Sequence, residues 1–289
     1  MTNRRTFLAQ AGLLSASVMI APNLLSAKGI KKVGLQLYSL RDQLPKDVNG
    51  VIAKVAAAGY KEVEPFGYSK EKGFWGLDAK AFNDLLKANR LTTPSGHYDM
   101  NKFFGTGSTD QLETYIEAAN ITGQTHVIVP SISNKFIKTV DDFKATADKL
   151  NKAAEICQKS GLKLGYHNHN FEWNPVDGTT FYDTVLDNTD PKLVAMEMDI
   201  YWVVRSGVDP LALIDKHPGR FSFVHIKDMD KTHPNLNTEI GKGSIDFTKI
   251  LSKAKQAGIK HFIVEQENYI DIDPYVSIAE SCNYLKEKV

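Results

Sequence analysis

The sequence predicts a single-domain α/β fold, the (β/α)8 TIM barrel, over residues 30–289. From residue 31 onward, short runs rich in Val, Ile and Leu alternate with longer segments of helical periodicity. Eight such strand and helix units occupy about 260 residues, which is close to the usual length of this barrel. Hydrophobic residues make up 42% of the chain and charged residues 24%, which is enough apolar side chain for a large core.

The strands are expected where short apolar runs end in polar residues. They are KVGLQLY (32–38), KEVEPF (61–66), LTTPSGHY (91–98), THVIVPS (125–131), LKLGYHN (162–168), LVAMEMD (193–199), FSFVHIK (221–227) and HFIVEQE (261–267). Helices are expected between them at residues 47–58, 78–89, 108–122, 140–160, 179–188, 209–216, 246–257 and 274–288. Glycine follows several of these helices, as is typical of a helix end: Gly59, Gly123, Gly161 and Gly258.

A doubly wound open sheet is the alternative arrangement of the same elements. It is less favoured, because no G-x-G-x-x-G phosphate loop follows the first strand. No linker or low-complexity tract divides the body of the chain. Residues 228–245 form the longest irregular segment, which we expect to be a loop over the active face.

The first 29 residues differ in composition from the rest of the chain. Arg4 and Arg5 precede an apolar stretch and then small residues, an order that resembles a twin-arginine export signal. We therefore expect residues 1–29 to be a signal and the mature protein to be exported to the periplasm. The apolar stretch is too short to span a bilayer, so no membrane span is expected after signal removal. An amphipathic first helix docked on the domain is the alternative reading.

The charge of the expected mature chain argues against a nucleic-acid partner. Removal of residues 1–29 deletes Arg4, Arg5 and Lys28 and no acid, so the net charge becomes 32 − 34 = −2. Nucleic-acid binding normally requires a basic surface. A small molecule is the expected partner, and the sequence allows a homo-oligomer.

Acids and histidines recur at the ends of the expected strands. In a parallel barrel the carboxyl ends of the strands surround one mouth, and residues of equal parity on a strand point to the same side. Any one of these residues alone is more simply explained as a helix cap or half of an ion pair. So many buried charges at one mouth instead require a cation. The residues are Gln36, Tyr38, Glu62, Glu64, His97, His167, His169, Glu197, Asp199, His225, Lys227, Glu265 and Glu267.

Four of the polar residues form a candidate metal site. Glu172, Asp199, His225 and Glu265 would provide three carboxylates and one imidazole from consecutive strands. Such a set suits one divalent ion, namely Mn²⁺, Mg²⁺, Co²⁺ or Zn²⁺. Open positions on the ion could accept a hydroxyl and a carbonyl oxygen of a sugar.

Several motifs resemble one known superfamily over residues 30–289. They are HNHNFEW at the fifth strand, MEMDIYWV at the sixth, FVHIKD at the seventh, IGKGSIDF in the following loop and VEQE at the eighth. Together they resemble the xylose-isomerase-like barrels, in particular the sugar isomerase/epimerase branch with ketose 3-epimerases, hydroxypyruvate isomerase and inosose dehydratase. Exported members of this branch are usually described as sugar phosphate isomerases/epimerases.

The resemblance implies a function for the candidate metal site. The family's metal-binding residues correspond to Glu172, Asp199, His225 and Glu265, and the family's acid/base pair to Glu172 and Glu265. The implied reaction is sugar isomerisation or epimerisation, in which a proton next to a carbonyl is removed through a metal-stabilised enediolate. A metal-dependent lyase or dehydratase acting on keto-sugars or 3-keto-glycosides is one alternative. A non-catalytic carbohydrate-binding barrel is another.

The remaining candidate residues are assigned to the substrate. Lys227 is expected to polarise an oxygen or stabilise an enolate, unless it only pairs with Glu197 or Asp228. Trp202 stands where epimerases of the family tend to have a histidine, and either stacks on a sugar ring or belongs to the core. The residues expected to contact substrate are His97, His167, His169, Trp202, Glu64, Glu267 and Tyr38.

Overall fold

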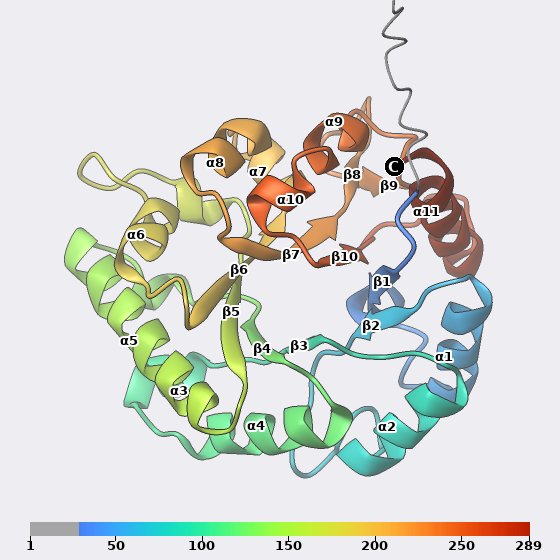
Figure 1. The fold of residues 1–289 in the computed structure, drawn as a ribbon, viewed down its shortest axis with the longest axis horizontal. Helices are drawn as coiled ribbons and strands as arrows, with labels where there is room; N and C mark the ends of the chain where they lie inside the picture. The colour runs from blue at the N-terminus through green and yellow to red at the C-terminus, as the bar shows by residue number, and fades with distance from the viewer. Residues whose placement is uncertain (1–28) are drawn as a thin grey trace, which may run out of the picture.

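The computed structural model describes residues 29–289, in which eight parallel strands form a barrel with helices outside (Figure 1). The order around the sheet is β2-β1-β10-β7-β6-β5-β4-β3. Isolated bridges between Glu62 and Thr92, and between Phe66 and His97, join its two ends. The predicted barrel is thus confirmed. Its strands are β1 (Val33–Gln36), β2 (Glu62–Glu64), β3 (Ser95–His97), β4 (His126–Val129), β5 (Lys163–His167), β6 (Val194–Asp199), β7 (Phe221–Ile226) and β10 (His261–Val264).

The helices lie close to their expected positions, with three differences. The helix expected at 246–257 is two short helices, α9 and α10, and two others, α3 and α7, were not expected. The helices are α1 (Val48–Ala57), α2 (Ala79–Ala88), α3 (Asn101–Thr106), α4 (Asp110–Thr122), α5 (Val140–Lys159), α6 (Phe181–Asn188), α7 (Ile200–Arg205), α8 (Pro210–Lys216), α9 (Phe247–Leu251), α10 (Ala254–Ala257) and α11 (Pro274–Lys288). Three short 3-10 helices are η1 (Leu37–Leu40), η2 (Asn134–Phe136) and η3 (Phe171–Trp173).

Local sequence explains where many helices begin. The helix α5 starts with a capping box, in which the Thr139 side chain accepts from the Asp142 amide and the Asp142 side chain accepts from the Thr139 amide. Pro210 and Pro274 occupy the first turns of α8 and α11, where the missing amide hydrogen costs nothing. Asp199 ends β6 and caps α7, so one residue closes a strand and opens a helix.

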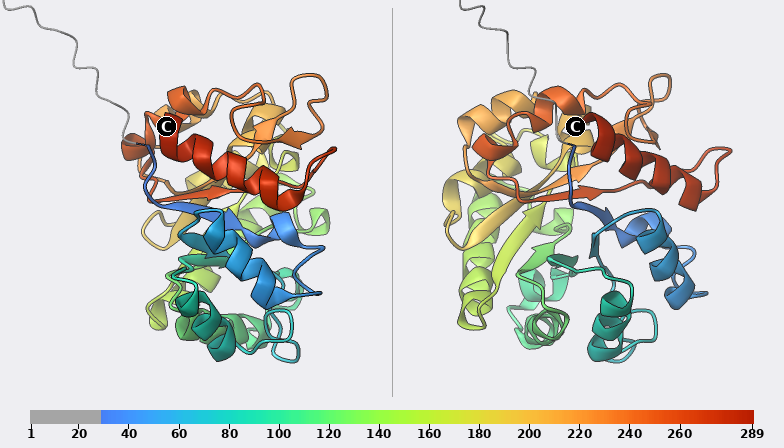
Figure 2. Two further views of the ribbon diagram at one scale, coloured as in Figure 1. Left: turned by 90° about the vertical axis from the view of Figure 1, so that its right-hand side faces the viewer. Right: turned by 45° about the vertical axis from the view of Figure 1, so that its right-hand side comes forward.

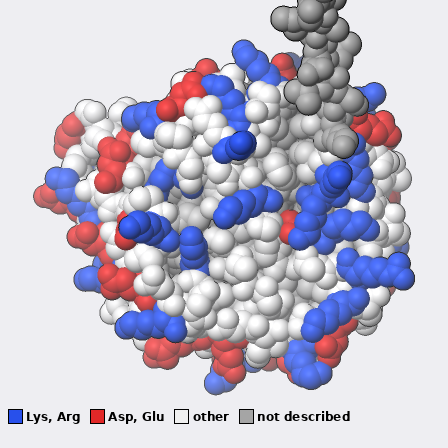
Figure 3. Space-filling view, in the orientation of Figure 1, with Lys and Arg blue, Asp and Glu red and all other residues white. Residues whose placement is uncertain are grey.

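The core lies between the strands and the surrounding helices. All residues of β1 and β6 are buried. Figure 2 shows α11 beside the first strand, and the backbone amide of Ile30 donates to the Leu285 carbonyl at 3.1 Å. Figure 3 shows acidic and basic side chains interspersed over one face. No helix within residues 29–289 is both long and apolar enough to cross a membrane.

Residues 228–245 are more ordered than a plain loop. They contain a short antiparallel pair, β8 (Asp228–Met229) and β9 (Asn237–Thr238). The Asp228 carboxylate accepts hydrogen bonds from the backbone amides of Met229, Gly241, Gly243 and Ile245 at 2.9–3.1 Å. The segment expected as an export signal, residues 1–29, lies outside the described residues except for Gly29.

Candidate functional site

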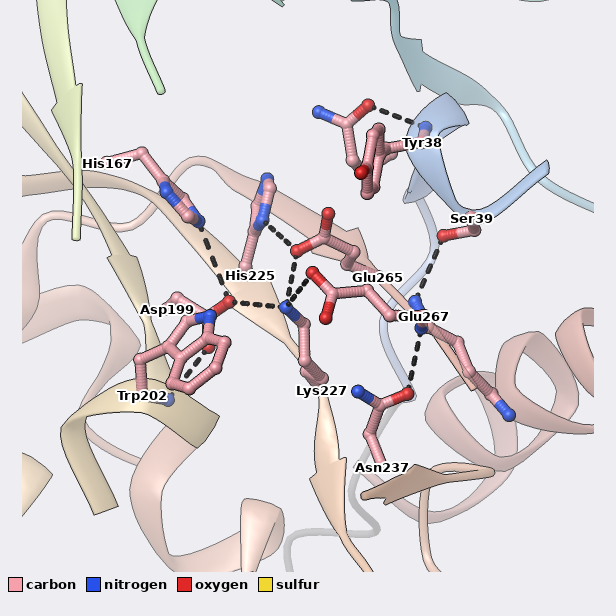
Figure 4. Close-up of polar contacts among 12 residues, drawn as sticks. Tyr38, Ser39, His167, Asp199, Trp202, His225, Lys227, Asn237, Glu265 and Glu267 are labelled. Atoms are coloured by element: carbon pink, nitrogen blue, oxygen red, sulfur yellow. Dashed lines mark hydrogen bonds and ion pairs between the residues drawn. The ribbon is translucent and has the colours of Figure 1, made fainter. Parts of the chain in front are cut away.

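Four side chains from neighbouring strands meet at the carboxyl end of the barrel. His167 ends β5, Asp199 ends β6, His225 lies near the end of β7 and Glu265 follows β10. Each offers one ligand atom, and these atoms all lie within 4.8 Å of one another. Figure 4 shows the four side chains pointing toward one another, with Lys227 beside them. All are buried, so their charges are shielded from bulk water. We call these four residues the mouth cluster.

The two carboxylate oxygens of Asp199 have different surroundings. Oδ1 accepts a hydrogen bond from the Trp202 amide at 3.1 Å, as the cap of α7. Oδ2 is fully buried and accepts no hydrogen bond of good geometry from the described residues. It is paired with the Lys227 ammonium at 3.2 Å and lies 3.6 Å from His167 Nε2. The cap therefore fixes the carboxylate so that its other oxygen faces Lys227 and the mouth cluster.

His167 faces Asp199 through Nε2. Its Nδ1 lies 3.2 Å from the Pro130 carbonyl oxygen, which can only accept, so Nδ1 carries the hydrogen. In the neutral ring, Nε2 then has a lone pair, and this atom has no hydrogen-bond partner within the described residues. Two ligands of one ion, each about 2.1 Å from it, lie about 3 to 3.5 Å apart. The 3.6 Å between His167 Nε2 and Asp199 Oδ2 is close to that separation.

The ring of His225 is held at both nitrogens by carboxylates. Nε2 lies 2.8 Å from Glu64 Oε2, and Nδ1 lies 3.2 Å from Glu265 Oε2. Burial lowers the pKa of His225, but Glu197, Glu265 and Glu64 outweigh burial and raise it well above 6.5, so the ring can donate from both nitrogens. Two imidazoles and two carboxylates therefore meet in the mouth cluster, and a divalent ion there would replace the Nδ1 proton. This donor set fits a divalent cation.

A second group lies next to the mouth cluster inside the barrel. Glu64, His97, Glu197 and His225 also bring four ligand atoms within 4.8 Å, and we call them the inner cluster. His97 Nε2 lies 2.7 Å from Glu197 Oε2 and 3.1 Å from Glu64 Oε2. These are hydrogen-bond lengths, so protons are sufficient to link the inner cluster. Burial lowers the pKa of His97, but Glu64 and Glu197 outweigh burial and raise it to about 9.

Lys227 is the fixed positive charge of the site. Its Nζ lies 2.7 Å from Glu265, 3.2 Å from Asp199 and 3.2 Å from Glu267. Burial opposes its charge, but these carboxylates outweigh burial and raise its pKa. Burial likewise raises the pKa of Asp199 and of Glu265, yet Lys227 and neighbouring histidines outweigh it, so both values are lowered. Lys227, Asp199 and Glu265 therefore stay charged near neutral pH.

The buried carboxylates around the two clusters outnumber the fixed positive charge. Glu64, Glu197, Asp199 and Glu265 are buried, and the Lys227 ammonium lies among them. Glu267, the fifth acid, is 28% exposed, so water can compensate its charge. Buried charge is costly unless it is compensated. Protons on the imidazoles of His97, His167 and His225 would balance the remaining three negative charges, and a divalent ion in the mouth cluster would replace two of these protons.

Glu172 lies apart from both clusters. Its carboxylate accepts from the Tyr166 hydroxyl at 2.8 Å and from the His169 amide at 3.0 Å. Burial raises its pKa to about 7, although these hydrogen bonds act in the opposite direction. The four-residue set expected from the sequence is thus brought together only in part: Asp199, His225 and Glu265 meet, and His167 occupies the fourth position.

A pocket of about 250 Å³ opens onto the mouth cluster. Its lining includes five of the residues expected to contact substrate, and also Glu265. Glu64 and Trp202 do not line it; Glu64 lies in the inner cluster, and the Trp202 ring lies 5.4 Å from Lys227 Nζ. The sequence assigned no role to Glu197, although its parity with Asp199 indicated an inward position. The lining residues are Tyr38, His97, Pro130, Ser131, His167, His169, Glu265 and Glu267.

Comparison with known proteins identifies a family that the chain matches. Residues 52–288 match a family model described as "Xylose isomerase-like TIM barrel". An inosose dehydratase from Clostridium perfringens is 28% identical over 155 residues, which cover 54% of this chain and 48% of that protein. The match therefore spans only about half the length of this curated relative.

Solved structures resemble the whole barrel. A sugar phosphate isomerase/epimerase from Parabacteroides distasonis has a TM-score of 0.80 and 29% identity, over 91% of this chain and 96% of that one. A structure of the IOLI protein with a bound zinc atom has a TM-score of 0.69 and 14% identity, over 87% of this chain and 95% of that one. The second likeness concerns the fold alone.

Proposed function

Because the chain belongs to the xylose isomerase-like TIM barrel family, we propose that it is a divalent-metal-dependent enzyme that moves a proton next to the carbonyl of a sugar. Two outcomes of that step are equally supported. One is isomerisation or epimerisation, the activity named for the Parabacteroides distasonis protein. The other is dehydration, the activity named for the Clostridium perfringens protein.

The facing ligand atoms of the mouth cluster carry this proposal. Among the described residues, His167 Nε2 has no hydrogen-bond partner, and it lies 3.6 Å from Asp199 Oδ2, which is paired with Lys227 at 3.2 Å. His225 and Glu265 complete a set of two imidazoles and two carboxylates. Imidazole nitrogen suits Mn²⁺, Co²⁺ or Zn²⁺ better than Mg²⁺, which prefers oxygen. We therefore propose one ion of the first group, held by His167, Asp199, His225 and Glu265.

The ion and the side chains have different roles in the proposed reaction. A bound divalent ion would stabilise the negative charge that develops on the carbonyl oxygen when the neighbouring proton leaves. Glu265 and Glu267 line the pocket, so we assign the proton transfers to them. Lys227 is too firmly charged to exchange protons readily, and it holds both carboxylates in place. Glu172, bonded to the His169 amide, is proposed to position the segment that carries His167.

Proton exchange tests the proposed reaction. The Mn²⁺-loaded protein is incubated in D₂O with a panel of ketoses, inososes and 3-keto-glycosides, and the products are followed by NMR. We expect deuterium on the carbon next to the carbonyl of at least one sugar. An epimer or isomer would identify an isomerase, and an unsaturated product a dehydratase. Absence of exchange from every sugar, with binding retained, would instead favour a non-catalytic carbohydrate-binding barrel.

Metal content separates the two candidate ligand sets. We expect Asp199→Asn, His225→Ala, Glu265→Gln and His167→Ala to lose bound metal, and Glu172→Gln to retain it. Glu62→Gln is the matched control, because Glu62 is buried on the same barrel but pairs with His261 and Lys32 at the other end. Loss of metal from Glu172→Gln but not from His167→Ala would restore the ligand set expected from the sequence. Unchanged metal in all variants would refute the site.

A further inference from the structure

A second cavity adjoins the pocket of the mouth cluster. It has a volume of about 400 Å³, against about 250 Å³ for the pocket itself. The two share Tyr38, His97 and Pro130 as lining residues, so they lie side by side. We call the second cavity the annex and define it by the residues that line it alone or at its outer end: Phe66, Tyr68, Tyr98, Asp99, Gln111 and Tyr115.

The walls of the annex are aromatic and firmly packed. Tyr38, which is 39% exposed, meets Phe66 edge to face with ring centroids 5.0 Å apart. Tyr68 packs on the buried Phe74 at 4.6 Å. The hydroxyl of Tyr115 donates to the Asp99 carbonyl at 3.2 Å, which fixes that ring. These rings present rigid apolar faces without first having to be ordered by a ligand.

The charge of the annex favours a neutral ligand. Among the described residues, none that lines the annex is Lys or Arg, and Asp99 contributes a carboxylate. His97, the one basic residue, is already shared between Glu64 and Glu197. The cations that border the annex lie outside its lining: Arg41 is over the Tyr38 ring at 4.8 Å, and Lys70 and Lys102 line a neighbouring cavity that shares Gln111 and Tyr115. A phosphate group inside the annex would therefore meet neither Lys nor Arg among the lining residues. Asp99 and Gln111 instead offer acceptors and a donor of the kind that hydroxyl groups use.

The volumes of the two cavities also favour a ligand that extends from the mouth cluster into the annex. Pockets for small ligands usually have volumes of roughly 300–1,000 Å³. The pocket of the mouth cluster lies below that range, whereas the pocket and the annex together lie within it. A ligand held only at the mouth cluster would leave the larger, aromatic cavity to water.

We propose that the annex is a subsite for a second, uncharged sugar ring, so that the substrate is a keto-disaccharide or similar glycoside with its carbonyl ring at the mouth cluster. This inference rests on the proposed function for the placement of the carbonyl ring. The apolar face of the second ring stacks on Tyr68 and Phe66, and its hydroxyls bond to Asp99 and Gln111. The aromatic walls thereby select for a glycoside over a single ring or a sugar phosphate.

Paired ligands of one and two rings test the subsite. Calorimetry with the Mn²⁺-loaded full chain compares lactulose, turanose and palatinose with D-fructose, and 3-keto-lactose with methyl 3-keto-galactoside. We expect at least one two-ring sugar to bind about 3- to 10-fold more tightly than its single-ring partner, the gain typical of one aromatic stacking contact. Tyr68→Ala should bring the ratio of two-ring to one-ring affinity close to 1. Gln111→Trp, which fills the outer end of the annex, should bring that ratio below 1.

Controls keep the test independent of folding and of catalysis. Tyr275→Ala removes another partly buried tyrosine, on α11, that lines neither cavity, and should leave the ratio unchanged. The subsite would be overturned if the two-ring and one-ring sugars of every pair bound with equal affinity. It would also be overturned if the preference for two rings persisted in both Tyr68→Ala and Gln111→Trp. Two-ring binding without deuterium exchange would leave the subsite standing and refute the proposed function alone.

Discussion

His225 shows how a buried ring can be aimed by its neighbours. Glu64 contacts Nε2 at 2.8 Å and Glu265 contacts Nδ1 at 3.2 Å, so rotation of the ring would break both contacts. Gln36 in turn donates to Glu64 at 2.7 Å and holds that carboxylate. Metal-binding histidines commonly depend on such a partner at the second nitrogen. The inner cluster is thus the support for the mouth cluster.

This dependence gives a prediction for Glu64→Gln. The neutral amide cannot hold the His225 proton as strongly, so we expect the affinity for Mn²⁺ to fall about 10-fold. Calorimetric titration of the metal-free protein measures it. Glu62→Gln changes the same residue type two positions earlier in β2, where Glu62 contacts His261, and should keep the wild-type affinity. Equal affinities for the two variants would show that Glu64 does not orient His225.

The identity of the fourth mouth residue could not be predicted from the sequence. Parity placed both His167 and Asp199 on the inner side of their strands, and both lie there. Glu172, however, follows β5 by several residues, and its direction is set by η3 (Phe171–Trp173) and by its hydrogen bond to the His169 amide. The motif HNHNFEW gives only the order of these residues along the chain. The conformation of η3 determines that His167, and not Glu172, reaches the mouth cluster.

At the scale of elements, the segment 228–245 supports the end of β10. The Asn237 side chain accepts hydrogen bonds from the amides of Glu267 and Asn268 at 2.8 and 3.0 Å. Gln266 donates to Glu239 at 3.2 Å from the other side. This segment was expected to cover the active face; the structure shows that it holds the backbone that carries Glu265 and Glu267, and none of its residues lines the pocket of the mouth cluster.

Asp228 is the residue on which this segment depends most. Asp228→Ala would leave four backbone amides without their acceptor, those of Met229 and Ile245 buried, so we expect the free energy of unfolding to fall by about 3 kcal/mol. Urea unfolding measures this loss, and limited proteolysis between residues 230 and 243 should become faster. Asp230→Ala, which removes an acceptor from an exposed turn, should cost less than about 1 kcal/mol. Similar losses from both variants would contradict this role.

The elements themselves were largely predictable. The period of apolar residues and the capping residues predicted most of the helices and every barrel strand to within a few residues. The helix α7 was missed because apolar residues continue directly past Asp199 in MDIYWVV, so that this single polar residue separates the strand from the helix. The bounds of α9 and α10 were missed for a related reason, since the turn at Ser252 and Lys253 carries neither Gly nor Pro.

At the scale of the whole molecule, polar side chains occupy separate levels inside the barrel. Glu62 and His261 lie at the amino end, the inner cluster lies above them, and the mouth cluster lies at the carboxyl end. These levels follow from the register between strands, for example His225 beside Asp199 and Glu64 beside Gln36. A single strand does not reveal its register, so the sequence predicted that these residues converge but not how they divide into clusters.

The amino end of the barrel predicts a loss of stability in acid. His126 packs against Phe223, and burial, followed by repulsion from His261 and Lys163, lowers its pKa from 6.5 to about 3. As the pH falls, the unfolded chain therefore takes up a proton on His126 at a higher pH than the folded chain does. The stabilisation from neutral His126 is complete above pH 6.5 and is lost as the pH falls toward 3. Between pH 7 and pH 4.5 we expect a loss of about 2 kcal/mol from this group.

Substitution isolates the contribution of His126. Urea unfolding with EDTA present, so that metal release does not intervene, should show a weaker pH dependence for His126→Gln than for the wild type. His233→Gln changes an exposed histidine and should leave the pH dependence unchanged. An identical acid response of wild type and His126→Gln would show that this side chain does not stay neutral in the folded protein.

The position of a bound ion would show whether the mouth cluster is a metal site. Crystals of the Mn²⁺-loaded protein, measured for anomalous scattering, should show one strong peak contacted by His167 Nε2, Asp199 Oδ2, His225 Nδ1 and Glu265 Oε2, with Lys227 outside the coordination shell. An empty mouth cluster in which the Lys227 ammonium alone bridges Asp199 and Glu265 at saturating Mn²⁺ would show that these four residues do not bind the metal.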